Sequence, residues 1–484
     1  MPARGKPAAA SRRARLVLVA LLALAAAPRL YLAVTDHGIA WPDEVYQSLE
    51  PAHRFAFGYG LQAWEYRAGA RNLTFAATLA ALMRTSSAVG LDSPRAYLLV
   101  VRVLLVALAL WAIGCVYLLA RRFEAPAWAA LVATALASLF VPSIYFAHRA
   151  LSEVASMPLS AMGLYLALEV DGARWRRLLG ASLLGLACLW RPHNALLAVG
   201  LLACLVAWRS WRAALEAALV LALWALVLGL VDKLSWGGWF RSLVVYLDVN
   251  VAQDYAARRF GRQPLSYYLT TLVSAGGLGC ASLLLSAAAL VRWRRAAALL
   301  ALALGFIAVH SAVGHKELRF VLPALPLLFA ATALGLGVIA ERARVAATLA
   351  ACAAMLLALV SAARAPSLTY RDLGVTSAMP PAHSAFDWPG DVNRLLLAAH
   401  GRGDLCGLLN SATITVHSGG YTYLHRRVPL YARQKWPPSV RCYNYRIGLA
   451  PRAGEREVAR EGLFVLLRRA GGCVRDTSYN DKAN

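Results

Sequence analysis

Carboxylates are scarce in this sequence, and so is charge of any kind. Its 484 residues contain 25 Asp and Glu against 50 Lys and Arg, and charged residues make up only 15% of the chain. Hydrophobic residues make up 60%, and the mean hydropathy is +0.54. A soluble domain cannot bury so large an apolar fraction, so the composition excludes one and predicts a multi-pass membrane protein.

Several motifs of familiar chemistry are absent as well. The chain has no Walker phosphate loop, no Cys/His group at metal-ligand spacing and no GxSxG nucleophile motif. The sequence therefore predicts no metal site and no cofactor. The formal charge of +25 does not indicate a nucleic-acid partner, because the arginines form short clusters between apolar runs. Such clusters are what the positive-inside bias of membrane proteins requires.

Apolar runs alternate with Arg-rich turns, and this alternation predicts the topology. If the turns near residues 121, 174, 209, 292 and 341 are cytoplasmic, an even number of crossings separates each from the next. Two of the runs are short for a bilayer, so they form either two short spans or a re-entrant hairpin with "RPHN" at its tip. We expect an uncleaved first helix and about eleven membrane segments, at residues 16–34, 95–120, 126–146, 156–172, 178–190, 195–208, 213–231, 266–291, 296–313, 321–340 and 345–363.

The chain is expected to divide into a transmembrane catalytic domain at 1–363, with a first outside loop at 35–94, and a small extracytoplasmic α+β domain at 364–484. In this tail, residues 411–432 mix β-branched and aromatic residues with a Gly-Gly turn, which favours a hairpin or an α+β unit. His417 and His425 are interpreted as surface histidines. The three tail cysteines, Cys406, Cys442 and Cys473, permit one disulfide and leave one thiol over.

The first outside loop concentrates ionisable groups directly after an apolar run. Pro42 suits the first helical position, and Asp43 and Glu44 suit the next two, where acids favour the helix dipole. These acids either only cap the helix or place a carboxylate at the water–lipid boundary, where it can accept a proton from a substrate hydroxyl. The spacing predicts an amphipathic surface helix with Val45, Leu49 and Ala52 on one face and Asp43, Gln47, Glu50 and Arg54 on the other.

The rest of this loop, "LQAWEYRAGARN" and residues 74–91, adds aromatic, acidic and basic groups. Aromatic rings beside charges suit sugar and phosphate recognition, although Trp and Tyr are also common in interfacial belts. The apolar stretch 74–91 contains Arg84 and would break the topology if it were a span, so we expect a second surface or partly embedded helix.

A later turn, "GHKELRF", gathers cations where the topology places an outside loop. His315, Lys316 and Arg319 outnumber Glu317 there. The turn is either a misassigned cytoplasmic loop, a local salt-bridge cluster, or an anion site for a lipid-linked phosphate. The residues that we predict to contact substrate from the outside segments are Glu50, His53, Arg54, Trp64, Glu65, Arg71, Arg149, Glu153 and Asn250.

Taken together, these motifs resemble glycosyltransferase family 22, the multi-pass mannosyltransferases that use a lipid-phosphate sugar. The resemblance begins with "PDE", "QSLEPAH", "GYG" and "AWEY" in the first loop, although Trp41 stands where the family has His. It continues in order through "RP" at 191, the segment 232–239, Asn250, Phe260 and Gly261, Pro264, Tyr267 and Tyr268, and "HKELRF". The tail sequence "CGLLNSATITVHSGGYTYLHRRVPL" resembles a Cys and His-Ser-x-x-Tyr-x-x-x-His region of the members that act on GPI anchors.

The resemblance implies a GT-C fold and an inverting transfer of mannose from a polyprenyl-phosphate donor to a hydroxyl of a lipid-linked glycan or glycolipid. By this resemblance Asp43 is the general base, Glu44 assists it, and His315, Lys316 and Arg319 hold the donor phosphate. A phosphate leaving group needs no metal when cations stabilise it. The Ala-, Arg- and Leu-rich composition suggests a bacterial inner membrane, with the site facing the periplasm.

Two other functions compete with this interpretation. A lipid-linked sugar flippase or transporter would carry polar residues in mid-span and paired halves, whereas these spans contain almost no acids and show no two-fold repetition. Another GT-C reaction, such as protein O-mannosylation, would keep the enzyme class and change the acceptor.

Overall fold

The computed structural model describes residues 11–39, 41–375, 384–413, 417–432, 442–471 and 473, without the side chains of residues 294 and 295. The chain forms two compact units, the first from residues 1–31 and 105–382 and the second from residues 32–104 and 383–484. The unit boundaries fall inside helices α1 (Arg12–Thr35) and α5 (Pro94–Arg122). Compactness is a different criterion from membrane burial, so the domain boundary expected at residue 363 stays a prediction.

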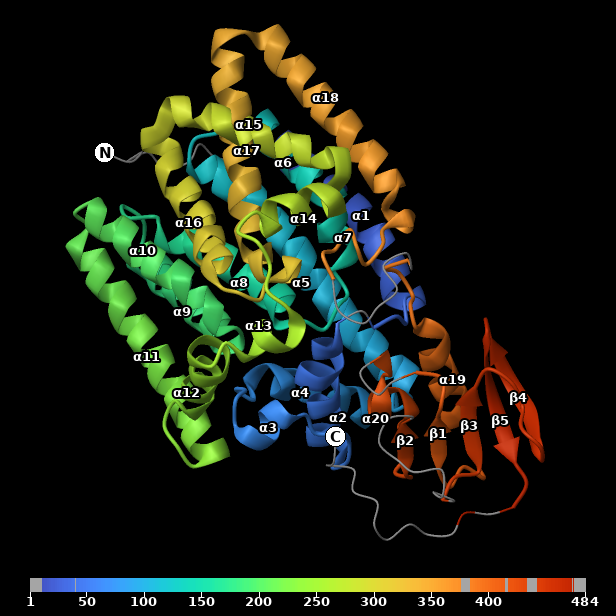
Figure 1. The fold of residues 1–484 in the computed structure, drawn as a ribbon. Helices are drawn as coiled ribbons and strands as arrows, with labels where there is room; N and C mark the ends of the chain where they lie inside the picture. The colour runs from blue at the N-terminus through green and yellow to red at the C-terminus, as the bar shows by residue number, and fades with distance from the viewer. Residues whose placement is uncertain are drawn as a thin grey trace. The chain divides into compact units, whose positions relative to one another are not determined.

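Within the described residues of the first unit, the elements of secondary structure are all helices (Figure 1). Helices α9, α10 and α11 pack side by side, and α17 packs against α6, α15, α16 and α18. The helices after α5 are α6 (Ala127–Leu139), α7 (Val141–Tyr145), α8 (Ser152–Ala167), α9 (Arg174–Trp190), α10 (Ala195–Ala207), α11 (Trp211–Trp236), α12 (Arg241–Leu247), α13 (Tyr255–Phe260), α14 (Tyr267–Gly276), α15 (Ala281–Ala288), α16 (Trp293–Ala312), α17 (Leu325–Arg342) and α18 (Arg344–Ala363).

The exposed apolar faces of these helices indicate that lipid, and not water, surrounds them. Among the described residues, six helices are long and apolar enough to cross a membrane, beginning at Arg12, Pro94, Trp211, Tyr267, Leu318 and Arg344. Helix α11 exposes a full stripe of leucines, at positions 215, 219, 223, 226, 230 and 234. Water would not tolerate such a stripe, but lipid does. The protein is therefore a multi-pass membrane protein, and the expected number of about eleven segments stays a prediction.

Close helix contacts in this unit depend on small residues. Gly163 of α8 and Gly180 of α9 face each other, and a Cβ atom on Gly163 would lie only 2.8 Å from the carbonyl oxygen of Gly180. Such contacts let two backbones approach where no hydrophobic effect drives association. After α9, residues 192–194 form one tight turn before α10 begins, so the residues of "RPHN" join two short helices as expected.

The second unit begins with the first outside loop. Its chain is helical from Pro42 to Phe57, first as a wide π-type segment, η1 (Glu44–Leu49), and then as α2 (Glu50–Phe57). Helices α3 (Trp64–Ala68) and α4 (Thr74–Ala88) follow, and α4 packs against α2. The expected helix in residues 74–91 is therefore confirmed as a helix.

The predicted amphipathic pattern of this segment is only half correct. Val45, Leu49 and Ala52 are buried as expected, but Glu50 is fully buried as well. The prediction used an angular step of 100° per residue, whereas π-type turns bond residue i to i+5 and contain more residues per turn. The phase of the helix therefore changes across η1, and Glu50 faces inward.

A mixed sheet closes the second unit. Its order is β2-β1-β3-β5-β4, with β1 parallel to β2 and β3, and β5 antiparallel to β3 and β4. Helix α19 (Gly390–His400) packs on β3, β4 and β5 (Figure 1). The strands are β1 (Leu408–Asn410), β2 (Leu430–Ala432), β3 (Tyr445–Gly448), β4 (Glu455–Glu461) and β5 (Phe464–Arg469).

The tail is an α+β arrangement, so of the two alternatives given for residues 411–432 the structure has the α+β unit rather than the hairpin. Gly420 has a φ of +57° and begins a short helix, α20 (Gly420–Leu424), instead of a β-turn. Residues 414–416 lie outside the described part of the chain. His417 is buried rather than on the surface, and His425 is half-buried.

The open question of the tail cysteines has one answer in the structure. Cys406 and Cys473 form a disulfide that closes a sequence separation of 67 residues, and Cys442 is buried and lies outside this disulfide. We predict that peptide mapping under non-reducing conditions yields one linked pair, Cys406 with Cys473. Maleimide should modify Cys442 only after denaturation, because its side chain is 6% exposed. A linked peptide that contains Cys442 would contradict this pairing.

Candidate functional site

Asp43 lies in the second unit beside a second carboxylate. Asp43 is half-buried at the start of the helical segment, and Glu65 interacts electrostatically with it and with Arg71. Gln47 donates a hydrogen bond to Glu65 across 3.3 Å, and the Tyr66 hydroxyl donates to the Gln47 carbonyl across 2.6 Å. Three of the predicted site residues, Asp43, Glu65 and Arg71, thus belong to one neighbourhood.

The proton affinity of Glu65 differs from that of an ordinary carboxylate. Burial raises its pKa, Asp43 raises it further by like-charge repulsion, and Arg71 and Gln47 oppose this. A carboxyl group whose pKa is raised by burial and by a neighbouring carboxylate is a feature of many acid–base sites.

Glu50 is held entirely by protein groups. One carboxylate oxygen accepts hydrogen bonds from the backbone N–H of Thr422 at 2.6 Å and from its hydroxyl at 2.7 Å. The other accepts from the backbone N–H of Leu61 at 2.8 Å. Burial raises the pKa of Glu50 to about 7, although these hydrogen bonds lower it. Its predicted contact with substrate remains untested.

His53 lies one turn after Glu50 and contacts a second residue of the tail. Its Nδ1 donates to the carbonyl of Tyr59 at 2.9 Å, and its Nε2 lies 2.9 Å from Nδ1 of His425. Burial lowers the pKa of His53 to about 3 and that of His425 to about 4, so both rings are neutral at physiological pH. In neutral rings this geometry makes His53 Nε2 the acceptor and His425 Nδ1 the donor.

The remaining predicted residues of the first loop have different surroundings. Arg54 donates to the carbonyl of Gly60 at 2.8 Å. Glu44 is buried, with 5% of its surface exposed, and Trp64 is 40% exposed. An exposed indole beside a carboxylate pair is a surface on which a sugar ring can stack.

In the first unit, two arginines share one buried carboxylate. Glu153 at the start of α8 accepts from Arg319 at 2.9 Å and from Arg191 at 3.0 Å, and all three side chains are at most 4% exposed. Burial raises the pKa of Glu153, but the two guanidinium groups outweigh this effect and hold it below its ordinary value. Glu153 is therefore a buried anion.

The "HKELRF" turn continues this network. Glu317 accepts from Arg319 at 2.5 Å and from His315 at 3.0 Å. The guanidinium groups of Arg191 and Arg319 lie 5.3 and 5.0 Å from the ring centre of Phe320. Arg319 and Glu317 thus form a salt bridge within the turn, and the role of the turn as an anion site stays a prediction.

Lys316 differs from these neighbours. Its side chain is 3% exposed, and its ammonium group donates to the carbonyl of Gln263 at 2.8 Å. Within the described part of the chain, no carboxylate forms an ion pair with it. Burial and the charge of Arg262 lower its pKa. Among the described residues, Arg191 and Arg319 thus have carboxylate partners in Glu153 and Glu317, whereas the partner of Lys316 is a carbonyl.

The other two residues predicted in this unit, Asn250 and Arg149, contact different groups. Asn250 is half-buried and donates to the carbonyl of Tyr246 at 3.1 Å, and the Tyr246 hydroxyl lies 3.0 Å from Nε2 of His193. Arg149 is 1% exposed and lies 4.5 Å above the ring of Tyr145.

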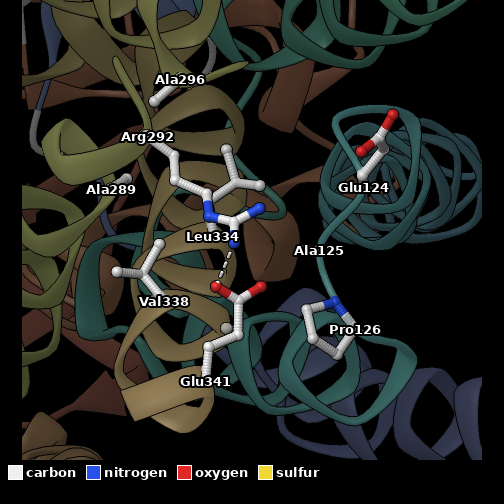
Figure 2. Close-up of a pocket in the computed structure, with 10 residues that line it drawn as sticks. Glu124, Ala125, Pro126, Ala289, Arg292, Ala296, Leu334, Val338 and Glu341 are labelled. Atoms are coloured by element: carbon white, nitrogen blue, oxygen red, sulfur yellow. Dashed lines mark hydrogen bonds and ion pairs between the residues drawn. The ribbon is translucent and has the colours of Figure 1, made fainter. Parts of the chain in front are cut away.

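A small pocket in the first unit contains none of the predicted residues. Figure 2 shows the side chains of Arg292 and Glu341 pointing toward each other in its lining. Nη2 of Arg292 lies 2.5 Å from Oε2 of Glu341, so the two side chains form an ion pair. Pro126, Leu334 and Val338 form apolar walls, and Glu124 lies on its rim. Glu124, Arg292 and Glu341 lie at or beside turns that the topology predicts in the cytoplasm. Among the described residues, no group of three or more His, Cys, Asp or Glu side chains could hold a metal ion.

Three residues of these networks were missing from the predicted site. Arg191 was noted only as an echo of the family, Thr422 was not singled out, and His425 was taken for a surface residue. Two patterns could have pointed to these residues: the Arg-Pro dipeptide of "RPHN", which resembles the family, and the spacing of "HSGGYTYLH". Neither pattern reveals a partner that lies 372 residues away in sequence, as Thr422 does from Glu50.

Comparison with known proteins assigns the family. The model of the Alg9-like mannosyltransferase family matches residues 20–383, which include Asp43, Glu153, Arg191 and the "HKELRF" turn. The chain belongs to this family. The resemblance to glycosyltransferase family 22 is thereby confirmed.

Individual relatives of this Alg9-like chain share about a third of its residues in the aligned regions. It is 32% identical over 327 residues to GPI mannosyltransferase 3 of Yarrowia lipolytica, a match that covers 65% of this chain and 61% of that protein. It is 29% identical to GPI alpha-1,2-mannosyltransferase 3 of Mus musculus, over 59% of this chain and 53% of that protein. The chain thus matches between half and two thirds of the length of these relatives.

Among solved structures, ArnT from Cupriavidus metallidurans bound to undecaprenyl phosphate is similar over 93% of this chain and 97% of its own, with a TM-score of 0.59 and 14% identity. The likeness shows the fold alone. It confirms the predicted GT-C fold of this member of the Alg9-like family.

Replacing Glu50 tests its proton affinity. Between about pH 4.5 and 7 the folded protein binds a proton that the unfolded chain releases, so the contribution of Glu50 to stability falls as pH rises through this window. His53 and His425 act in the opposite direction, since their folded pKa values lie below the ordinary value of 6.5. A comparison with Glu50→Gln cancels the histidines.

We predict that the difference in Tm between Glu50→Gln and the parent protein rises by about 5 °C from pH 5 to pH 8. The sign follows because Gln mimics the protonated acid and stays neutral at pH 8. The measurement is thermal unfolding of the detergent-solubilised protein. A difference that stays constant with pH would contradict the raised pKa.

Proposed function

We propose that this protein transfers mannose from a polyprenyl-phosphate donor to a hydroxyl of a lipid-linked glycan or glycolipid. The observation that carries the proposal is the family match over residues 20–383. The names of the relatives support mannose as the sugar and a glycolipid as the acceptor. The solved structure with a similar fold holds undecaprenyl phosphate, which supports a polyprenyl-phosphate carrier.

In the proposed reaction Asp43 removes the proton from the acceptor hydroxyl. The hydroxyl oxygen forms a bond to the anomeric carbon as the bond from that carbon to the phosphate oxygen breaks. The electron pair of the broken bond goes to the polyprenyl phosphate, and the configuration inverts. Glu44 is assigned to assist Asp43, and Glu65 is suited to share the released proton because its pKa is already raised.

His315, Lys316 and Arg319 are proposed to hold the donor phosphate. Lys316 supports this role most directly, because its buried ammonium group has only a carbonyl partner within the described residues. A buried, uncompensated cation is costly unless an anion is present for part of the reaction cycle. Glu153 and Glu317 hold the guanidinium group of Arg319 in one place. Arg319 is therefore suited to orient the phosphate.

The disulfide gives an argument for the side of the membrane on which the tail lies. A bond between Cys406 and Cys473 needs an oxidising compartment, which the bacterial periplasm provides and the cytoplasm does not. This supports placing the tail and the site on the extracytoplasmic face of a bacterial inner membrane.

Asp43→Asn tests the proposed base. The amide cannot accept the proton, so we expect turnover to fall by about 10²- to 10⁴-fold while the protein accumulates normally. The assay measures transfer of radiolabelled mannose from polyprenyl-phosphate mannose to lipid-linked glycans in membranes. Glu457→Gln, at a solvent-exposed carboxylate of β4, serves as the control. Full activity of Asp43→Asn would exclude the role of Asp43.

Lys316→Met tests the donor site. Methionine keeps much of the apolar side chain and removes the charge, so we expect kcat/KM for the donor to fall about 10²-fold. Lys233→Met is a matched control, because Lys233 also donates to a carbonyl, that of Gly237 at 2.9 Å, but is exposed. Equal behaviour of the two variants would exclude a special role for Lys316.

The acceptor is best identified by mass spectrometry of lipid-linked glycans in a strain that lacks the gene. Accumulation of a glycolipid one hexose shorter than in the parent strain is the expected result. Loss of sugar from proteins with unchanged glycolipids would favour protein O-mannosylation. Glycolipids of full length trapped in the inner leaflet would favour a flippase.

A further inference from the structure

Two short helices of the second unit face each other with matching polar spacing. Glu50 and His53 are three residues apart on α2, and Thr422 and His425 are three residues apart at α20. Glu50 contacts Thr422, and His53 contacts His425. Residues three apart lie on the same side of a helix, so one face of α2 binds one face of α20 through two consecutive polar contacts.

The first of these contacts is tightly fitted. A Cβ atom on Gly420 would lie 2.8 Å from the carboxyl carbon of Glu50, so the backbone of α20 approaches the carboxylate closely. Thr422 supplies two donors to one oxygen, and Leu61 supplies a third to the other. This set requires a flat group with two acceptor oxygens, which a carboxylate provides and an amide does not.

The second contact adds direction. His53 donates from Nδ1 to the carbonyl of Tyr59. This leaves Nε2 of His53 as the nitrogen that accepts the hydrogen bond from Nδ1 of His425. His425 has a φ of +42°, a conformation that costs energy in a residue other than glycine. The His53 contact and the rings of Phe57 and Tyr97 surround the His425 ring and help to hold it.

The start of α5 holds α20 from another direction. The Tyr97 hydroxyl donates to the carbonyl of Thr422, and Arg102 donates to the Tyr423 hydroxyl at 2.6 Å. Helix α20 is therefore fixed by α5 and offers α2 a rigid partner. The side chains of Tyr97, Thr422 and Tyr423 are completely buried.

We propose that Glu50, His53, Thr422 and His425 form a lock through which the tail fixes the helix that carries Asp43. The chain is helical without interruption from Pro42 to Phe57, so holding α2 fixes the orientation of its first turn. The four lock residues are positioning residues that act through Asp43. This inference rests on the proposed function, and it replaces the predicted contact of Glu50 and His53 with substrate.

The lock also accounts for the wide turns of η1. The π-type segment rotates Glu50 and His53 onto the face that meets α20, while Asp43 stays half-buried one and a half turns earlier. A regular α-helix would place Glu50 on the face of Asp43 and Gln47, as the sequence analysis expected. Segments of this type often occur at functional sites.

Hydrogen exchange at pH 8 tests the contact without any assay of activity. In Glu50→Gln the amide NH2 group must face either Leu61 or Thr422, so one backbone N–H loses its acceptor. We expect at least about 10-fold faster exchange in the peptides that contain Leu61 and Thr422. Glu455→Gln is the matched control, because Glu455 is a buried carboxylate of the same unit that binds Arg446 of the sheet. Unchanged exchange at both peptides in Glu50→Gln would overturn the lock.

Kinetics then distinguish positioning from mere structural support. We expect Glu50→Gln and Thr422→Val to lower kcat about 10-fold per folded protein with KM for the donor within about twofold. Thr422→Ser keeps both donors and should retain the parent rate, and Glu455→Gln should leave the rate unchanged. If Glu50→Gln does not accumulate, Thr422→Val carries the test. Faster exchange with an unchanged kcat would show a structural contact only and overturn the proposal.

A double variant separates this inference from the proposed function. If Glu50 acts through Asp43, adding Glu50→Gln to Asp43→Asn should cause no further loss of the residual rate. An additive loss would overturn the lock while leaving Asp43 as the base. Full activity of Asp43→Asn alone would overturn the base, whereas the hydrogen-exchange result would still report whether the contact exists.

Discussion

The cost of burying a carboxylate governs the polar architecture of this protein. The chain has few acids, yet it buries Glu50 in one unit and Glu153 in the other with at most 1% of their surface exposed. An ionised carboxylate in such a site is stable only when protein groups replace the lost water. Each of the two acids therefore collects its partners from distant parts of the sequence, and each becomes the point at which those parts are joined.

The two acids solve this problem in opposite ways. Arg191 and Arg319 neutralise Glu153, so it remains an anion and its pKa is lowered. Dipoles of Thr422, Leu61 and Tyr421 hold Glu50, and burial outweighs them, so its pKa is raised. Two guanidinium groups hold Glu153, whereas Lys316 donates to a carbonyl, which suits the donor-phosphate site that we propose. Dipoles hold Glu50 with directional precision, which suits a joint between two helices.

The sequence predicted the features that repeat along the chain and missed those that depend on distant pairs. Long apolar runs predicted the helices, and the "HKELRF" turn predicted the cation cluster. The face of Glu50 was wrong, because the π-type turns of η1 leave no mark in the apolar spacing. The sequence left a hairpin and an α+β unit open for residues 411–432, and the structure has the α+β unit, with helix α20 lying close to Glu50. The low exposure of His417 arises from tertiary packing that periodicity does not encode.

The structure also divides the crowded first loop into groups with different tasks. Glu50, His53 and Arg54 are engaged with the tail or with the backbone of the loop itself. Asp43 keeps part of its surface exposed beside Glu65 and Arg71, and Trp64 remains 40% exposed. A substrate can approach only groups that retain accessible surface. Most charges of this loop thus hold it in place, and the reaction that we propose relies on the few groups that keep accessible surface.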